Sequence, residues 1–294
     1  MRPRTWRWGL ACACALAWTA CTSESTPAPA APPPSLERVN ILFGREEAPR
    51  AAELRFALAL DVKTEVRERR GAPPRTASAR WNVENVTRYR VLQEGTGGLE
   101  LELTVLKDRD SDTPASAPSA LEGHTFLAVS QGGTRTVTEQ GRPVGPEQRE
   151  RVLEMVDDSL GDLSDVGRVL AGTQMTPGER LPELEAVLSR MFQFGPDESE
   201  RRSSVRARLR GGDPIGKIAL VDVEMDVSLV EAPLEINSHL RGTLSLDLAT
   251  GTPRRLDLRG PARVAPLHAA ALQGMTAQGE GTLRLELEVS LRGG

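Results

Sequence analysis

Aromatic residues and lysine are scarce in this sequence of 294 residues. Phe, Trp and Tyr make up 3% of the chain, and the lysines are Lys63, Lys107 and Lys217, so arginine supplies nearly all of the positive charge. So few aromatic side chains argue against binding by stacking on bases, and against a transmembrane β-barrel with aromatic girdles. The formal net charge of −4 gives no basis for attraction to nucleic-acid phosphates. The sequence therefore predicts no nucleic-acid partner.

The motifs of common enzyme classes are missing as well. The sequence has no G-x-S-x-G, no P-loop, no dinucleotide-binding glycine pattern and no H-E-x-x-H. His124, His239 and His268 have no second His or Cys at zinc-ligand spacing. We therefore expect no enzyme, no cofactor and no metal in this chain. A hydrolase that uses two carboxylates is the open alternative, because paired acids carry no sequence signature.

One acidic stretch, "DRDSD" at 108–112, begins like a calcium-binding EF-hand loop. Such a loop needs Gly at its sixth position and Glu at its twelfth. These positions hold Thr113 and Ser119. The sequence favours a solvated loop over 108–120 instead.

A second acidic stretch lies in an expected strand, where Asp222, Glu224 and Asp226 alternate and so share one face. Calcium binding through their oxygens is one interpretation. The other is a solvated sheet face, on which they pair across strands with the arginines of the basic stretch 201–210 at about 0.2–1 kcal/mol each. The matching alternation of the arginines favours the second. Those arginines could also bind anionic lipid headgroups or an acidic partner.

The N-terminus has the three parts of a secretory signal peptide. It is basic at Arg2, Arg4 and Arg7, and a short apolar run follows over about 8–20. That run is too short to cross a bilayer, which takes about 20 apolar residues. All three cysteines lie in this part of the chain, the last of them at Cys21. We expect residues 1–20 to be removed.

The exit of this segment, Trp-Thr-Ala-Cys at 18–21, resembles the bacterial lipobox. The resemblance to predicted bacterial lipoproteins implies that Cys21 is acylated and becomes the new N-terminus, with the membrane as its partner. Thr22 after the cysteine implies the outer membrane of the cell envelope, with the body facing the periplasm or the cell surface. The alternative is an ordinary secretory signal that leaves Cys21 as a free thiol. Residues 22–35, rich in Pro and Ala, predict an extended tether of about 40 Å.

Residues 36–294 predict a single β-rich domain, because apolar residues alternate along both of its ends. "LRFALALDV" around 54–62 and the stripe of Leu283, Leu285, Leu287, Val289 and Leu291 are the clearest cases. The expected strands cover about 39–43, 54–62, 80–93, 98–107, 124–130 and 134–140 before the middle of the chain, and 203–210, 218–230, 242–248, 254–260 and 283–291 after it.

A helical insertion is expected over about 146–194, where the apolar period changes. Val152, Val156, Leu160 and Leu163 predict one helix beginning near Pro146. A second helix carries Leu181, Leu184, Leu188 and Met191 and begins near 182. "TPGE" at 176–179 is either its capping box or a turn.

Two C-terminal hairpins have an expected register. Pairing around "GGDPIG" would place Arg206 opposite Asp222 and Arg202 opposite Asp226. Pairing around "ATGTP" would place Leu246 opposite Leu258 and Leu248 opposite Leu256.

Together these elements predict an α+β fold, a curved and mainly antiparallel sheet, half-open and barrel-like, with a two-helix insertion in its middle. This element order is similar to that of bacterial envelope lipoprotein carriers, which are half-open β-barrels capped by helices. The resemblance implies a non-enzymatic module that binds a hydrophobic ligand. The alternative is a tethered scaffold or assembly protein that binds another envelope protein.

Overall fold

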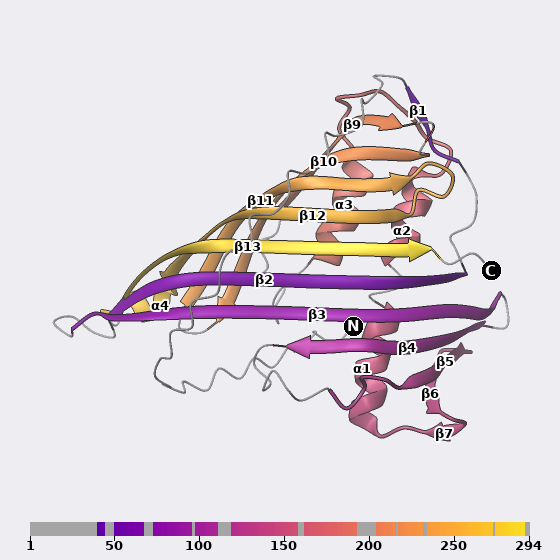
Figure 1. Ribbon diagram of the computed structural model, residues 1–294, viewed down its shortest axis with the longest axis horizontal. Helices are drawn as coiled ribbons and strands as arrows, with labels where there is room; N and C mark the ends of the chain where they lie inside the picture. The colour runs from indigo at the N-terminus through magenta and orange to yellow at the C-terminus, as the bar shows by residue number, and fades with distance from the viewer. Residues whose placement is uncertain are drawn as a thin grey trace, which may run out of the picture.

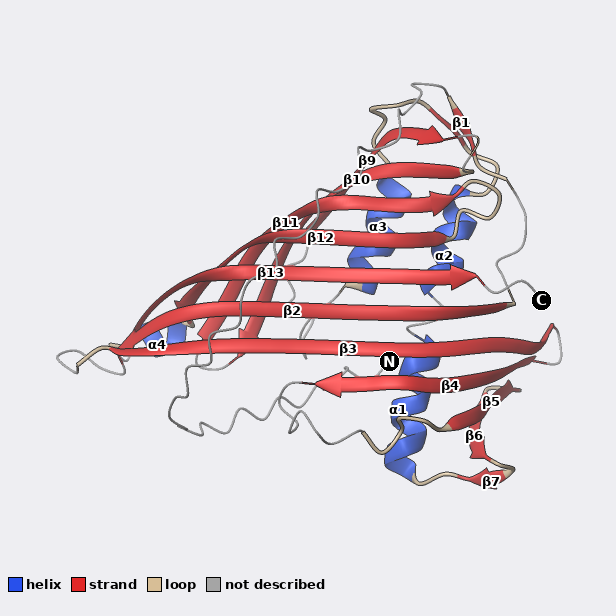
Figure 2. Cartoon of the chain, viewed as in Figure 1, coloured by secondary structure: helices blue, strands red, loops and turns tan. Residues whose placement is uncertain are grey.

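The computed structural model describes residues 40–44, 50–67, 73–95, 98–110, 119–157, 162–192, 204–213, 215, 217–231, 234–272 and 274–291. Cys21, the expected leader at 1–20 and the expected tether at 22–35 lie outside the described residues, so they stay predictions. In the described part, an 11-stranded antiparallel sheet curves around three helices without closing into a barrel (Figures 1 and 2). The expected α+β fold is confirmed.

The strands of the large sheet lie in the order β7-β6-β5-β4-β3-β2-β13-β12-β11-β10-β9, and β1 pairs with β8 in a separate two-stranded sheet. The strand bounds are β1 (Ile41–Leu42), β2 (Ala51–Arg67), β3 (Arg75–Gly95), β4 (Gly98–Asp110), β5 (Thr125–Gln131), β6 (Thr134–Glu139), β7 (Arg142–Pro143), β8 (Gln174–Met175), β9 (Ser204–Asp213), β10 (Ile218–Glu231), β11 (Leu234–Asp247), β12 (Pro253–Pro266) and β13 (Thr276–Leu291). The helix bounds are α1 (Pro146–Val156), α2 (Asp162–Leu170), α3 (Pro182–Met191) and α4 (His268–Leu272).

The insertion contains three helices rather than the expected two. A single helix was expected to run from Pro146 through Leu163, but α1 ends at Val156 and α2 begins at Asp162. Val166 and Leu170 bury one face of α2. Apolar spacing continues across both helices, so it gave no sign of the break. The stretch 176–179 is a turn, in which the Thr176 N–H donates to the Glu179 carboxylate at 2.8 Å.

The first hairpin has a different register from the expected one. Arg208 lies opposite Asp222 and Arg206 opposite Glu224, while Arg202 lies outside the described residues. The difference is set at the turn, where Ile218 already pairs with Asp213. A β-bulge then shifts the register by one residue, since Leu220 pairs with Gly211 and Val221 pairs with Leu209, which leaves Arg210 as the extra residue.

The second hairpin is also shifted, because Leu244 pairs with Leu256 and Gly242 with Leu258. Its turn lies earlier than the sequence suggested. The Asp247 carboxylate accepts hydrogen bonds from the N–H groups of Ala249 at 2.9 Å and Thr250 at 3.0 Å, and this fixes the turn at 247–252.

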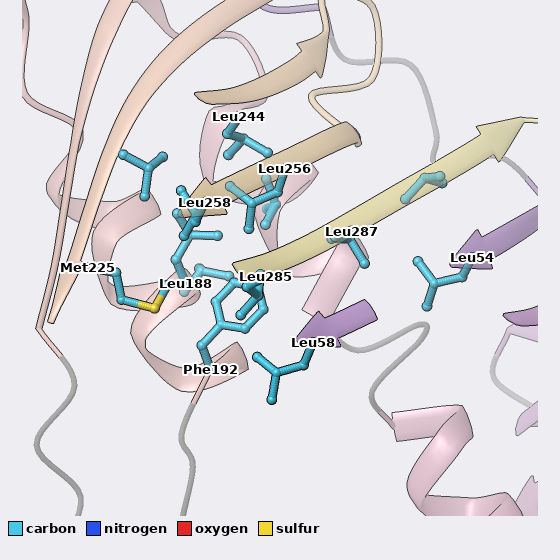
Figure 3. Close-up of a cluster of buried hydrophobic side chains, with 14 of the residues drawn as sticks. Leu54, Leu58, Leu188, Phe192, Met225, Leu244, Leu256, Leu258, Leu285 and Leu287 are labelled. Carbon is cyan, nitrogen blue, oxygen red and sulfur yellow. The ribbon is translucent and has the colours of Figure 1, made fainter. Parts of the chain in front are cut away.

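The inner face of the sheet carries the core, and its side chains form rows across the strands. One row consists of Leu244, Leu256, Leu287 and Phe56, toward the β11–β12 turn. Leu258, Leu285 and Leu58 follow in the next row, and α3 packs over them through Leu188, with Phe192 just beyond its last turn (Figure 3). Alternate burial along each strand sets this face, as expected for a sheet with one wet side.

A diagonal of glycines bends the sheet. Gly242 on β11, Gly260 on β12 and Gly281 on β13 face inward, and each lies one row further along than the one before. A Cβ at these positions would lie 1.8, 2.0 and 2.0 Å from a carbonyl oxygen of the neighbouring strand. Only glycine permits so close an approach, so this diagonal allows the sharp curvature seen in Figure 1.

Both edges of the sheet are protected. At one edge, the Leu181 N–H donates to the Ala207 carbonyl at 3.0 Å, and the Leu209 N–H of β9 donates to the Glu179 carbonyl at 2.9 Å. The buried Glu185 carboxylate accepts the Ala207 N–H at 2.9 Å. At the other edge, β7 is two residues long and ends in Pro143. Short, proline-containing or covered edges resist pairing with another chain.

Candidate functional site

The candidate site is the inner face of the central strands β13, β2 and β3. The helices pack mainly against the strands on either side of this face, and the end of α3, at Leu188 and Phe192, reaches over Leu285 and Leu58. α1 packs against β5 and β6, while α2 packs against β12 and α3 against β9 (Figure 1). The three central strands therefore lie between two groups of helices.

Two large aromatic side chains on this central face are only partly buried. Phe56 follows the inward alternation of Leu54 and Leu58, which are 8% and 3% exposed, but Phe56 itself is accessible to solvent in part. Trp81 lies opposite Leu60 and is likewise partly buried. The face thus presents accessible apolar surface on its inner side, which suits contact with an apolar molecule.

Further partly buried apolar residues face inward beyond the glycine diagonal. Leu229, Leu234 and Ile236 pack against the edge of the core there. The neighbouring inner positions hold small residues such as Ser238 and Ala262. The far part of the face is therefore lined by small, uncharged side chains at these positions.

Polar side chains interrupt the central face on β3. Asn85 lies opposite Phe56, and its buried Oδ1 atom has no hydrogen-bond partner within the part of the chain that the structure describes. Tyr89 also points inward on β3, and burial raises the pKa of its hydroxyl to about 12. A buried acceptor without a donor costs free energy, so Asn85 Oδ1 is a place where a donor from a bound molecule would be stabilised.

The acidic stripe lies on the opposite, outer face, where cations pair with it. The Arg210 guanidinium donates to Asp222 at 2.7 Å, and Arg241 lies 3.3 Å from Glu224. His239 bonds Asp226 at 2.7 Å through Nδ1. The carboxylates are therefore arranged as cross-strand charge pairs rather than as a convergent oxygen cage.

Ser204, Asp226 and His239 come together on adjacent strands, but not in the order of a hydrolytic triad. The Ser204 hydroxyl donates to the Asp226 carboxylate at 2.9 Å rather than to the imidazole. His239 Nε2 instead accepts a hydrogen bond from Arg241 at 2.9 Å. Hydrogen bonding from His239 lowers the pKa of Asp226; burial opposes this shift, and the Ser204 hydrogen bond adds a smaller lowering. The imidazole nitrogen that would activate a serine is already engaged.

The remaining sequence candidates are dispersed. His124 Nδ1 bonds Glu139 across β5 and β6, and its ring stacks on Phe126 at 6.3 Å between centroids. His268 begins α4. Asp108 lies 3.6 Å from Arg151 of α1, and Asp112 lies outside the described residues. Across the described residues, no three His, Cys, Asp or Glu side chains gather in a way that could hold a metal ion.

Comparison with known proteins gives no assignment. No family model matches the chain, and no curated protein sequence matches it either. In the described part, no helix is long and apolar enough to cross a membrane.

The sequence interpretation did not single out Phe56, Trp81 or Asn85. Their inward alternation is visible in the sequence, since Phe56 shares the parity of Leu54 and Leu58. Their partial exposure depends on where the helices lie over the sheet, and a single strand pattern does not contain that information.

Proposed function

We propose that this protein is a lipid-anchored, non-enzymatic binding module of the bacterial envelope, whose inner sheet face binds a hydrophobic molecule. The observation that carries the proposal is the accessible apolar surface at Phe56 and Trp81, on a curved sheet between two groups of helices (Figure 1). Apolar surface removed from water by a ligand would contribute about 25 cal/mol per Å².

The chemistry of the face supports an apolar ligand with at most a small polar group. Buried leucine and valine surround Phe56, and the polar atom near it is the unpartnered Asn85 Oδ1. A ligand with an apolar body and one hydroxyl or amide donor fits that pattern. Ion pairs lie mostly on the outer face, as between Arg55 and Glu84 at 3.0 Å.

Binding is tested with the full chain and a fluorescent 18-carbon polyene fatty acid, cis-parinaric acid, as the probe. We expect saturable binding that Phe56→Ala weakens by roughly tenfold, because the variant removes one of the two accessible aromatic side chains of the face. Leu92→Ala is the matched control, since Leu92 is 41% exposed and lies on β3 with the opposite alternation. No saturable binding, or equal weakening by both variants, would contradict the proposal.

The anchor is tested separately. We expect radioactive palmitate to label the wild-type chain and not Cys21→Ala, in cells where the chain fractionates with the outer membrane. A chain that stays in the cytosol with residues 1–20 attached would overturn the location. A partner that co-purifies from solubilised envelopes, together with failure of fatty-acid binding, would favour the scaffold alternative.

A further inference from the structure

One large apolar side chain stands almost fully in solvent at the tip of the β9–β10 hairpin. Ile215 is 97% exposed, compared with 65% for Leu42 and 41% for Leu92, the other exposed large apolar residues of the described part. The Ile215 N–H donates to the Asp213 carboxylate at 3.0 Å, so the backbone at this tip is held. Folding does not bury this isoleucine, so contact with a partner can still gain the hydrophobic free energy of burying it.

Leu42 belongs to the same end of the molecule. Its neighbour Ile41 packs on the hairpin, because a Cβ on Gly212 would lie 2.6 Å from the Ile41 Cδ1. The Gly44 N–H donates to the Leu248 carbonyl at 2.7 Å, and the Leu248 N–H donates to the Lys217 carbonyl at 2.9 Å. These contacts fasten β1 beside the hairpin, at the end where its label lies in Figure 1.

The described chain begins at this same end. Residues 1–39 precede Asn40, and Asn40 leads directly into β1. Whatever holds the N-terminal part of the chain at a membrane therefore connects to the body beside Ile215 and Leu42. The exposed Lys217 next to Ile215 adds a cation whose long stem suits the boundary between acyl chains and anionic headgroups.

We propose that a membrane-facing tip, formed by Leu42, Ile215 and Lys217, inserts its apolar side chains into the surface of a phospholipid bilayer. The tip would orient the sheet with its helix-covered end toward the membrane. The opposite end, with α4 and the start of β3, would point away from it (Figure 1). The proposal rests on the expected N-terminal anchor but not on ligand binding by the inner face.

The test introduces Lys217→Cys into the full chain and labels it with an environment-sensitive fluorophore. The labelled protein is reconstituted into vesicles of phosphatidylethanolamine and phosphatidylglycerol that contain spin-labelled lipid. Spin label quenches the fluorophore only at bilayer depth. We expect the spin label to quench the fluorophore when Ile215 is present. In Ile215→Ser, roughly tenfold less fluorophore should be inserted, because burial of an aliphatic side chain in the bilayer favours insertion by about that factor. The unsubstituted chain is labelled in parallel, and the fluorescence from its native cysteines is subtracted.

A matched label at Ser78→Cys reports on the opposite end, since Ser78 is an exposed residue in the far part of β3. That label should remain unquenched. Quenching equal at both ends, no quenching at position 217, no effect of Ile215→Ser, or absence of the chain from the vesicles would each overturn the proposal. Fatty-acid binding by the same samples is measured independently, so loss of one property is distinguishable from loss of the other.

Discussion

The same strands build two unlike halves of the inner face. In the helix-covered half, large leucines such as Leu256 and Leu258 are 0% exposed beneath α2 and α3 (Figure 3). Beyond the glycine diagonal no described helix from the insertion covers the strands, yet Ala262 is 0% and Val62 1% exposed. Burial in the first half comes from a helical layer with bulky side chains. In the far half smaller side chains such as Ala262 line the inside of the bent sheet.

This difference shows two ways in which a protein with few aromatic residues can complete a core. A helical layer needs side-chain volume to fill the space between layers. A bent sheet needs the opposite, because volume on the inside of the bend would force the strands apart. The two halves should therefore respond to opposite kinds of substitution.

The largest expected effect is an added side chain at the bend. Gly260→Val should destabilise the protein by about 4 kcal/mol, since its Cβ would lie 2.0 Å from the His239 carbonyl oxygen and the backbone would have to move. Urea unfolding followed by circular dichroism measures this loss. Gly145→Ala is the control, because nothing lies within 4 Å of a Cβ there. Equal stability of the two variants would show that the diagonal does not determine the curvature.

The helix-covered half should instead be sensitive to lost volume. Leu258→Ala is expected to cost about 3 kcal/mol of unfolding free energy, because Leu258 is fully buried beneath Leu188 and the cavity cannot collapse between a helix and a sheet. The same truncation at the exposed Leu92 should change stability by less than about 0.5 kcal/mol. A loss below about 1 kcal/mol for Leu258→Ala would mean that α3 packs loosely on the sheet.

The sequence predicts some features of these two halves and misses others. Alternation located β2 and β13 because each strand buries one face along its whole length. It could not place the hairpin registers, since these depend on the bulge at Arg210 and on the turn that Asp247 holds. Gly242, Gly260 and Gly281 are visible in the sequence at inward positions, but their diagonal exists only once the strands are paired.

The candidate site was predictable to a similar extent. Strand parity places Phe56 on the inner face, and the amphipathic helices indicate that something covers that face. Which residues stay uncovered depends on α1 docking on β5 and β6 while α2 and α3 dock on the other side. Those contacts join segments far apart in the sequence, so local patterns do not report them.

The contacts that hold α3 at the edge of the sheet should make a smaller, pH-dependent contribution to the free energy of unfolding. Hydrogen bonding from Arg180, opposed in part by burial and aided by the Ala207 N–H, lowers the pKa of Glu185 below its ordinary value of 4.5. A carboxylate whose pKa is lower in the folded than in the unfolded state stabilises the fold above about pH 4.5, and this contribution is lost as the pH falls.

Glu185→Gln should therefore reduce stability by about 1.5 kcal/mol at pH 7, the lower end of the range for hydrogen bonds to charged groups. The gap from wild type should narrow as the pH falls from about 5 to about 3. Thermal unfolding over that pH range measures it. Glu183→Gln, an exposed carboxylate on the same helix, is the control and should show no such narrowing. A gap that stays constant with pH would assign the effect to packing instead.

The smallest effect on stability is expected at the membrane-facing tip. Ile215 is 97% exposed, so Ile215→Ser should leave the free energy of unfolding in water within about 0.5 kcal/mol of wild type. Ile41, which packs on Gly212 of the same hairpin and is 5% exposed, provides the contrast, and Ile41→Ser should cost about 2–3 kcal/mol. Chemical denaturation without lipid compares the two. If Ile215→Ser were as costly as Ile41→Ser, the tip would belong to the core of the protein. If Ile215→Ser keeps the stability of wild type but loses membrane insertion, then Ile215 acts at the surface of this end and Ile41 in the packing behind it.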